Sequence, residues 1–391
     1  VTTAPRICVR YECVPMRFIK HVYRIHTYAQ DGRLFEGKTP VSAFLNSSYD
    51  GSFIAGLMEL RYIQSLPVER IINYFESHGF TLKKPTAHKL MEKASSLFEN
   101  LYKCIRQTAL SDPYKAADET YYKILVPEKN SKGKGFRKGY LWVVVGINTR
   151  MIYLLYDDGS RSEKVILNEL GGCKGIIQSD GYSPYRKLES DAYPHITRIP
   201  CLQHIKRKFI DCGEDDPDAK RIVEMINTLY QNEHKHKIGV DGWTVEQNLV
   251  HRKKYAPDIL GEIKDVLDDI EERGDLLPKS ELKEAITYLR NEWNAVVDIF
   301  NYGDTYLDNN IVERMNRYIS LSRKNSLFFG SHKGAERGAI LYTIALTCRM
   351  NKVNLFEYLT DIINRTAEWQ PNTPLEKYRQ LLPDRWEKAN D

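Results

Sequence analysis

The stretch YLWVVVGINTRMIYLLYDDG, residues 140–159, contains two apolar runs separated by a short polar turn. Both runs are rich in β-branched and aromatic residues, which favour extended strands. The first is apolar almost without interruption through Val145, Gly146 and Ile147, as in a strand that is buried on both faces. These residues therefore predict two neighbouring strands of a buried sheet.

The segments on either side extend this sheet. Residues 117–128 (ADETYYKILVPE) predict a strand before it. After it come a short helix closed by glycines at 161–172 and a short buried strand at 173–182. A second helical stretch at 183–190 leads to a fifth strand at 195–201. Three strands followed by helix, strand, helix and strand predict a mixed α/β sheet.

Helical patterns fill most of the remaining chain. Residues 66–80 and 85–107 predict two helices joined by a turn at Gly79, an arrangement that matches a helix-turn-helix. Helical spacing then persists for about a hundred residues after Cys201, with no strand pattern. The first fifty residues instead alternate polar with aromatic or β-branched residues, and they predict a strand-rich segment.

Composition and charge exclude some classes of protein. Among the 391 residues no apolar run approaches the length of a membrane span, and no signal peptide opens the sequence, so we expect a cytoplasmic protein without a membrane partner. The seven cysteines are odd in number and scattered, which suits a reducing compartment. A net charge of +5 permits a polyanionic partner without demanding one. Because the first residue is valine, we expect the natural chain to begin further upstream.

Four possible zinc ligands lie in the strand-rich first segment, namely Cys8, Cys13, His21 and His26. Their arrangement is a poor match to a zinc site built from paired cysteines, and both cysteines lie inside a strand pattern. We therefore favour a strand pair with incidental cysteines and histidines over a bound metal.

Three carboxylates stand out as candidate metal ligands. Asp118 and Asp180 lie on the first and fourth predicted strands, and Glu313 lies in the helical stretch YLDNNIVERMNR at 306–317. Two Mg²⁺ ions, which prefer oxygen ligands, can clamp the attacking and leaving oxygens of a phosphoryl transfer when they are roughly 3.5–4 Å apart. Each acid alone could belong to a turn or a helix cap. The three together predict a two-metal site.

Basic residues surround these acids and would hold the phosphates of a DNA backbone. The alternative for each is an ordinary solvated helix face. Residues three and four apart share one face of a helix, so we expect Asn309, Asn310, Glu313 and Arg317 to line the site. The expected DNA contacts are Lys83, Lys84 and Lys89 on the second helix of the helix-turn-helix, Lys206, Arg207 and Lys208 after the fifth strand, and Arg314, Arg317, Arg323 and Lys324 around Glu313.

From about residue 10 onward the sequence resembles the DDE transposases of the insertion sequence 66 group. The most specific part is 306–359, which carries the acid-Asn-Asn, Glu-Arg, Arg-Lys-Asn and Phe-Gly-Ser elements of that group in order. The segments ADET, SDGYSPY, CLQHIKRKF and LPKSELKEAITYLRNEW also match in order. The resemblance implies a catalytic triad of Asp118, Asp180 and Glu313 on an RNase H-like fold, with two Mg²⁺ ions per site and Mn²⁺ as a possible substitute.

The same resemblance covers Cys201 and His204, which match a C-x₂-H signature of transposases with helical insertions. Such a pair could bind a metal, but no second pair accompanies it, and we favour a structural role at the junction of core and insertion. Glu313 lies 133 residues after Asp180, which leaves room for a helical insertion at 201–301.

The sequence departs from the group at its N-terminus. Family members often carry a zinc ribbon there, and the segment HTYAQDGRLFEG lacks the second cysteine pair, so this module is expected to be truncated or degenerate. The expected regions are a β-rich segment at 1–50, a helical DNA-binding region at 51–110, the two parts of the RNase H-like catalytic core at 111–200 and 302–365, the helical insertion at 201–301 and a C-terminal tail at 366–391.

The expected function is that of a DNA transposase, which cuts transposon ends and joins the freed 3′-OH to target DNA. Two alternatives remain open. One is an RNase H-like metal-dependent nuclease or resolvase, and the other is an inactive, domesticated DNA-binding protein, against which the intact acid triad argues. The expected partners are double-stranded DNA, further copies of the chain in a homodimer or larger assembly, and accessory proteins of the same element, in the bacterial nucleoid.

Overall fold

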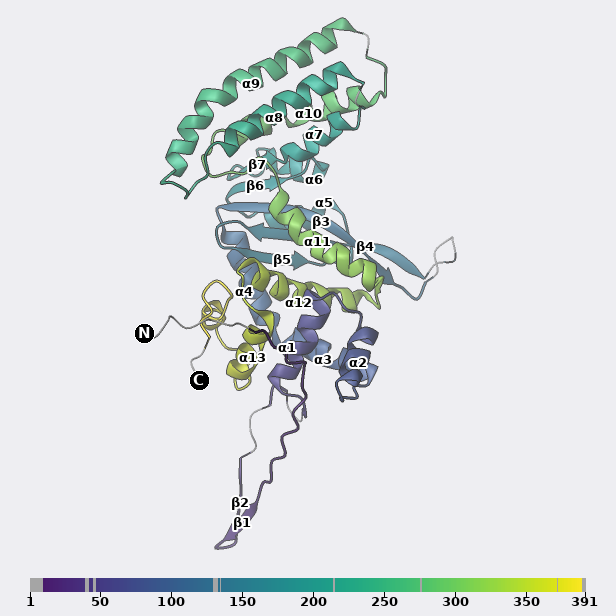
Figure 1. Ribbon diagram of the computed structural model, residues 1–391, viewed down its shortest axis with the longest axis vertical. Helices are drawn as coiled ribbons and strands as arrows, with labels where there is room; N and C mark the ends of the chain where they lie inside the picture. The colour runs from purple at the N-terminus through teal and green to yellow at the C-terminus, as the bar shows by residue number, and fades with distance from the viewer. Residues whose placement is uncertain are drawn as a thin grey trace, which may run out of the picture.

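The computed structural model describes residues 10–38, 42–44, 47–128, 133, 135–213, 215–274, 276–370 and 372–388. A mixed sheet lies at the middle of the molecule, with the helical insertion at one end and the N- and C-terminal helices at the other (Figure 1). The mixed α/β architecture expected from the sequence is confirmed. Its strands are β3 (Tyr114–Leu125), β4 (Phe136–Gly146), β5 (Met151–Leu155), β6 (Gly175–Ser179), β7 (Ile196–Pro200) and the short β8 (Phe328–Phe329).

The strands follow the order β5–β4–β3–β6–β7, and β8 pairs with the far end of β3. The β3–β4 and β4–β5 pairs are antiparallel, whereas β6 and β7 run parallel to β3. The apolar run predicted from the sequence lies in β4, between β5 and β3, and its residues Trp142, Val143, Val144 and Val145 are fully buried. Burial on both faces explains why β4 lacks an alternating pattern.

Helices cover the sheet and tie the two ends of the chain together. Helix α11 (Asn310–Asn325) packs on β3 and β4, while α4 (Glu99–Ser111) and α12 (His332–Met350) pack on β5. Two shorter segments, α5 (Glu163–Leu170) and α6 (Ser183–Arg186) with its 3₁₀ turn η2 (Lys187–Glu189), connect the parallel strands. The C-terminal helices are α13 (Leu355–Thr366) and α14 (Leu375–Arg379).

The N-terminal helices share one hydrophobic core with the sheet and the C-terminal helices. Helix α1 packs against α13, so segments from opposite ends of the sequence lie side by side (Figure 1). The sequence predicts one helix over 85–107, but the chain breaks it at the buried residue Phe98. These helices are α1 (Gly51–Met58), the π-helical turn η1 (Glu59–Ile63), α2 (Val68–Ser77), α3 (Lys84–Leu97) and α4.

The first segment contains less strand than its alternating sequence predicts. Within its described residues, only β1 (Thr27–Gln30) and β2 (Arg33–Glu36) pair, as an antiparallel hairpin that projects from the body (Figure 1). Every residue of both strands is exposed, so neither face of the hairpin has a core to cover. Alternation stabilises a strand only when one face is buried. Cys8, one of the four possible zinc ligands, lies outside the described residues.

The helical insertion has a hydrophobic core of its own. Its helices are α7 (Leu202–Ile210), α8 (Pro217–His234), α9 (Val245–Arg273) and α10 (Glu281–Ile299). Ile199 of β7 and Tyr114 of β3 also belong to this core, which therefore continues onto one edge of the sheet. In the described part of the chain, no helix combines the length and the apolar character needed to cross a membrane.

Candidate active site

Asp118 and Asp180 lie side by side because of the parallel pairing of β3 with β6. Ala116 pairs with Gln178, so the same register carried two residues further sets Asp118 beside Asp180. Burial, together with the negative charges of Glu119 and Asp180, raises the pKa of Asp118 to about 8. A carboxyl that resists ionisation beside two others is typical of a cation-binding or proton-transferring site.

Helix α11 crosses the sheet beside Asp118 and is fixed there by two asparagines. The side-chain Nδ2 of Asn309, the residue that precedes the helix, donates to the backbone carbonyl of Ala117 at 3.0 Å. About two turns further along, Nδ2 of Asn316 donates to Oδ2 of Asp118 at 2.5 Å. Both asparagines are buried, which fixes the rotation of the helix about its axis.

The inward face of α11 differs from the sequence expectation, which aligned Asn309, Asn310, Glu313 and Arg317. Asn309 is buried as expected, but Asn310 and Arg317 are exposed and Glu313 is half-buried. The residues that turn toward the sheet are Val312, Asn316 and Ile319. The apolar side chains at Val312 and Ile319 decide the rotation, because their burial outweighs any preference of the charged groups.

The turn that carries Asp180 is held by a buried arginine. Nη1 of Arg198, on β7, donates to the backbone carbonyl of Asp180 at 3.1 Å. The fully buried Arg198 guanidinium also pairs with Glu292 on α10 and with Glu189. Tyr288, on the same helix α10, accepts a hydrogen bond from the N–H of Gly181 at 2.9 Å. The insertion therefore positions the turn that bears the second aspartate.

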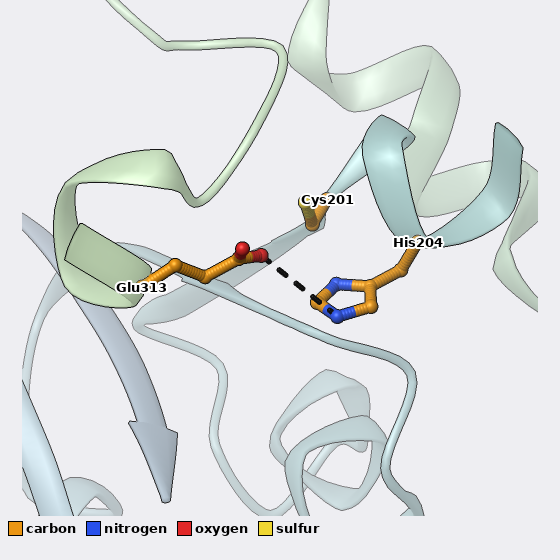
Figure 2. Close-up of side chains that lie close together, drawn as sticks. All are labelled: Cys201, His204 and Glu313. Atoms are coloured by element: carbon orange, nitrogen blue, oxygen red, sulfur yellow. Dashed lines mark ion pairs between the residues drawn. The ribbon is translucent and has the colours of Figure 1, made fainter. Parts of the chain in front are cut away.

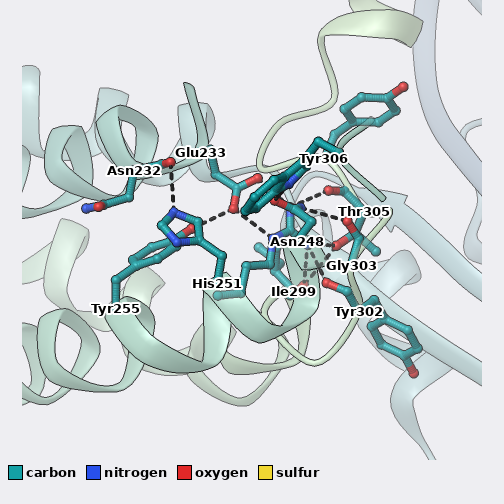
Figure 3. A network of polar contacts seen from close by, with 12 residues as sticks. Asn232, Glu233, Asn248, His251, Tyr255, Ile299, Tyr302, Gly303, Thr305 and Tyr306 are labelled. Atoms are coloured by element: carbon teal, nitrogen blue, oxygen red, sulfur yellow. Dashed lines mark hydrogen bonds and ion pairs between the residues drawn. The ribbon is translucent and has the colours of Figure 1, made fainter. Parts of the chain in front are cut away.

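The loop that leads into α11 is held by the insertion as well (Figure 3). The guanidinium of Arg252, on α9, donates to the carbonyls of Ile299, Tyr302 and Thr305, and it pairs with Glu233 of α8. Asn248, one turn earlier on α9, donates to the carbonyl of Gly303 at 2.8 Å. Glu313 follows this loop within one turn of helix, so α9 helps to set where Glu313 lies.

The side chain of Glu313 points toward Cys201 and His204 (Figure 2). Its Oε1 lies 3.8 Å from Nε2 of His204, and the ligand atoms of these three residues all lie within 4.8 Å of one another. Across the described ranges, Asp118, Asp180 and Glu313 do not form such a group. The structure thus brings the two aspartates together and places Glu313 on the helix that contacts Asp118, with its carboxylate turned to the histidine.

Cys201 lies at the junction between β7 and α7. It is buried, and its Sγ accepts a hydrogen bond from the backbone N–H of Asn309 at 3.2 Å. Next to it, the N–H of Leu202 donates to the carbonyl of Leu307 at 2.9 Å. These two bonds join the start of the insertion to the start of α11. Burial raises the pKa of the Cys201 thiol to about 11.

Several buried polar atoms around α11 have no hydrogen-bond partner within the protein. They are Oδ1 of Asn309, Oδ1 of Asn316, Oε1 of Glu313 and Nδ1 of His204. Buried polar atoms in native proteins are nearly always satisfied, so these atoms are available to a bound water, ion or ligand. Their concentration on the start of α11 and the adjoining α7 distinguishes this locus as a candidate binding site.

A further carboxylate, Glu119, lies next to Asp118 and was not singled out from the sequence. It follows Asp118 on β3, forms an ion pair with Arg161 and accepts a hydrogen bond from the Tyr185 hydroxyl at 3.4 Å. Burial raises its pKa, and the charge of Asp180 adds to that effect, although Arg161 opposes both. Its position next to Asp118 in the DET sequence was the signal that could have identified it.

The proposed DNA contacts differ in their surroundings. Lys83, Lys84 and Lys89 are exposed, although Lys84 pairs with Glu69 on α2. Lys206 is half-buried, and Arg207, Lys208, Arg314, Arg317 and Lys324 are exposed. The guanidinium of Arg323 instead stacks 3.9 Å from the ring centre of Tyr121 and donates to the Tyr121 carbonyl. Arg323 is therefore partly buried in a structural contact, whereas Arg314 and Arg317 are exposed.

The sequence of residues 46–337, about three quarters of the chain, matches the family described as Transposase IS66 family. The chain belongs to this family. The match includes the sheet, the insertion and all of α11, so it covers all three carboxylates.

The chain is also similar to three curated relatives, all of them uncharacterized proteins of Sinorhizobium fredii (strain NBRC 101917 / NGR234). The IS66 chain is 25% identical to y4jD over 85% of its own length, 24% identical to y4hP over 97% and 26% identical to y4qI over 94%. It spans 65%, 70% and 69% of the lengths of these relatives, respectively, so they are longer proteins.

The raised pKa of Asp118 predicts a pH dependence of stability in the metal-free protein. The unfolded carboxyl loses its proton near the ordinary pKa of 3.8, whereas the folded one keeps it up to about 8. Stability from this group is therefore fully present below about pH 4 and is lost as the pH rises toward 8, by up to about 1.4 kcal/mol per pH unit. Urea unfolding between about pH 5 and 8 should show a flatter dependence for Asp118→Asn. Equal slopes for both proteins would contradict the assignment.

Proposed function

We propose that this IS66-family chain is a DDE transposase that cuts transposon ends and joins the 3′-OH to target DNA by two-metal-ion chemistry. The observation that carries the proposal is the proximity of Asp118, within β3, to Asp180, which directly follows the parallel neighbour β6, with α11 fixed against Asp118 by Asn316. This arrangement places the helix that bears Glu313 across the strand that bears the first aspartate.

The topology supports an RNase H-like assignment for the core. Three antiparallel strands in sequence are followed by two strands parallel to the first, in the order β5–β4–β3–β6–β7. The sequence resemblance led us to expect an RNase H-like sheet with the two aspartates on its first and fourth strands. The helical insertion between β7 and α11 lies at one end of the sheet and adds no strand to it.

The donor groups at this locus fit Mg²⁺. Asp118, Asp180 and Glu313 offer carboxylate oxygens, which hard divalent cations prefer, and Mn²⁺ could substitute because it accepts the same ligands. Burial and the negative charges of Glu119 and Asp180 raise the pKa of Asp118, and a cation between the carboxylates would relieve their repulsion. Glu313 would join them by rotating its side chain away from His204. When bound, two such ions would polarise the scissile phosphate and stabilise the charge that develops during in-line displacement.

The protein itself would supply positioning rather than a nucleophile. Arg198 and Tyr288 hold the turn of Asp180, and the Nδ2 of Asn316 orients the carboxylate of Asp118. The exposed residues Arg314 and Arg317, on the same helix as Glu313, would contact DNA phosphates close to the scissile bond. Double-stranded DNA is therefore the proposed substrate, both at transposon ends and at the target.

Assembly and location follow from the proposed reaction. Two ends must be cut and joined together, so a homodimer or larger assembly on DNA is the simplest arrangement, and accessory proteins of the same element could take part. The site of action would be the bacterial nucleoid. Both the assembly and the location depend on the proposed transposase activity.

A strand-transfer assay tests the proposal directly. Labelled duplexes that carry the ends of the element are incubated with the chain, Mg²⁺ and an unlabelled target plasmid. Label that becomes covalently joined to the plasmid supports transposition. Cleavage without joining would instead indicate a nuclease or resolvase, and DNA binding without either reaction would indicate an inactive DNA-binding protein. Omission of the divalent metal is the control, and it should abolish both products.

The different surroundings of the α11 arginines predict different results for their substitution. Arg314→Ala and Arg317→Ala should each reduce the salt dependence of DNA binding by about one ion per lost phosphate contact, because both side chains are exposed. Arg323→Ala should chiefly lower stability, because it removes the stacking on Tyr121. Binding measured over a series of salt concentrations checks this. An unchanged slope for both exposed variants would assign them to an ordinary solvated surface.

A further inference from the structure

The cluster of Cys201, His204 and Glu313 combines sulfur, nitrogen and oxygen donors at one point (Figure 2). Cys201 follows β7 and directly precedes α7, and His204 lies three residues later in the first turn of that helix. Glu313 reaches them from the first turn of α11. Three separate features of the fold, the β7–α7 junction, α7 and α11, thus converge on a single volume.

Two further observations indicate that the cluster is suited to a ligand. Nδ1 of His204 and Oε1 of Glu313 are buried and lack hydrogen-bond partners, although both belong to strongly polar groups. The side chains of His204 and Glu313 remain 30% and 28% exposed, which leaves a path from solvent, while Cys201 is buried behind them. The backbone N–H of Asn309 donates to Sγ of Cys201, a contact that would stabilise a thiolate.

We propose that Cys201, His204 and Glu313 form a binding site for a zinc-class transition-metal ion. Tetrahedral zinc holds thiolate at about 2.3 Å and imidazole at about 2.0 Å, which places ligand atoms roughly 3.3–3.8 Å apart. The His204–Glu313 separation of 3.8 Å already meets this spacing. A thiolate and an imidazole select against Mg²⁺, which prefers oxygen, and three protein ligands leave the fourth position open to water.

Occupation of this site would compete with the proposed catalytic metal for Glu313. The carboxylate cannot serve both positions in one conformation, since Asp118 and Asp180 are not part of the cluster. A zinc-class ion would therefore hold Glu313 beside His204 and keep the acid triad incomplete. This consequence rests on the proposed function, whereas the binding of the ion does not.

Cobalt(II) is the probe for the binding test, because its thiolate complexes absorb strongly in the near ultraviolet. Titration of the full chain should give this absorption with one equivalent of Co²⁺, and Cys201→Ser should abolish it. Cys212→Ser and Cys13→Ser are the matched controls, and both should retain the absorption. This result would exclude the cysteine in the turn after α7 and the exposed N-terminal cysteine as the thiolate ligand. His204→Gln and Glu313→Gln, which leave the contact between Cys201 and Asn309 intact, should each weaken binding at least tenfold.

Absence of the absorption from the wild-type chain, or its persistence in Cys201→Ser, would overturn the metal site. Unchanged affinity in Glu313→Gln would overturn the shared role of that residue. In cleavage assays with excess Mg²⁺, Zn²⁺ should inhibit the wild-type chain at least tenfold more strongly than His204→Gln. Equal inhibition of both proteins would contradict the competition. If no protein cleaves DNA, the proposed function fails while the cobalt titration still decides the metal site.

Discussion

Replacement of Asp180 by asparagine should abolish DNA cleavage and strand transfer while leaving DNA affinity within about twofold of wild type. The same result is expected for Asp118→Asn and Glu313→Gln, with losses on the order of 10³-fold or more. Each substitution removes a metal ligand that acts only as part of a set, so the effects should not add in the double variants. Rates of end cleavage with saturating Mg²⁺ provide the measurement, and binding without metal provides the affinity.

Two control substitutions make this result specific. Asp157 is an exposed acid in the loop after β5, so Asp157→Asn should cut DNA normally. Glu119 neighbours Asp118 on β3 but pairs with Arg161, and Glu119→Gln should retain activity within about tenfold. Near-normal cleavage by Asp118→Asn together with inactivity of Glu119→Gln would move the first metal ligand by one residue along the strand.

The sheet could be predicted because its strands carry their own signal. The expected fifth strand at 195–201 corresponds to β7 (Ile196–Pro200), and the expected strand at 117–128 overlaps most of β3 (Tyr114–Leu125). Continuous apolar runs leave few alternatives to a buried strand. The exposed hairpin β1–β2 shows the limit of that reasoning, because an alternating sequence does not reveal whether anything covers one of its faces.

Only the part of the site that lies on the sheet strands could be predicted from the sequence. Asp118 lies within β3 and Asp180 directly follows β6, and the parallel pairing of these two strands brings the aspartates together. Asn316 was missed because the face of α11 was assigned from its charged residues, whereas Val312 and Ile319 determine it. Glu313 and His204 lie 109 residues apart in the sequence, and their contact depends on the torsion angles of both side chains. The spacing of residues in the sequence carries no information about those angles.

Replacement of Arg252 by methionine should lower the free energy of unfolding by about 3–5 kcal/mol, the usual cost of leaving a buried ionic partner uncompensated. Arg252 is 1% exposed. Its two Nη groups contact three carbonyls and Thr305 Oγ1, while Nε and Nη2 pair with Glu233. Burial raises the pKa of Glu233, but Arg252 holds it below the ordinary value, so the lost pair would leave a buried carboxylate unbalanced. Urea unfolding monitored by tryptophan fluorescence measures the change.

Lys253→Met is the matched control for Arg252→Met, because the neighbouring lysine is exposed and makes one hydrogen bond, to Asn301. Its cost should stay below about 0.5 kcal/mol. Arg252→Lys should restore little of the loss, since an ammonium group cannot span the planar set of acceptors that the guanidinium contacts. Because Arg252 holds the loop that enters α11, hydrogen exchange at 302–309 should accelerate in Arg252→Met and cleavage should fall with it. Stability within about 1 kcal/mol of wild type, with unchanged exchange in that loop, would show that α9 does not position Glu313.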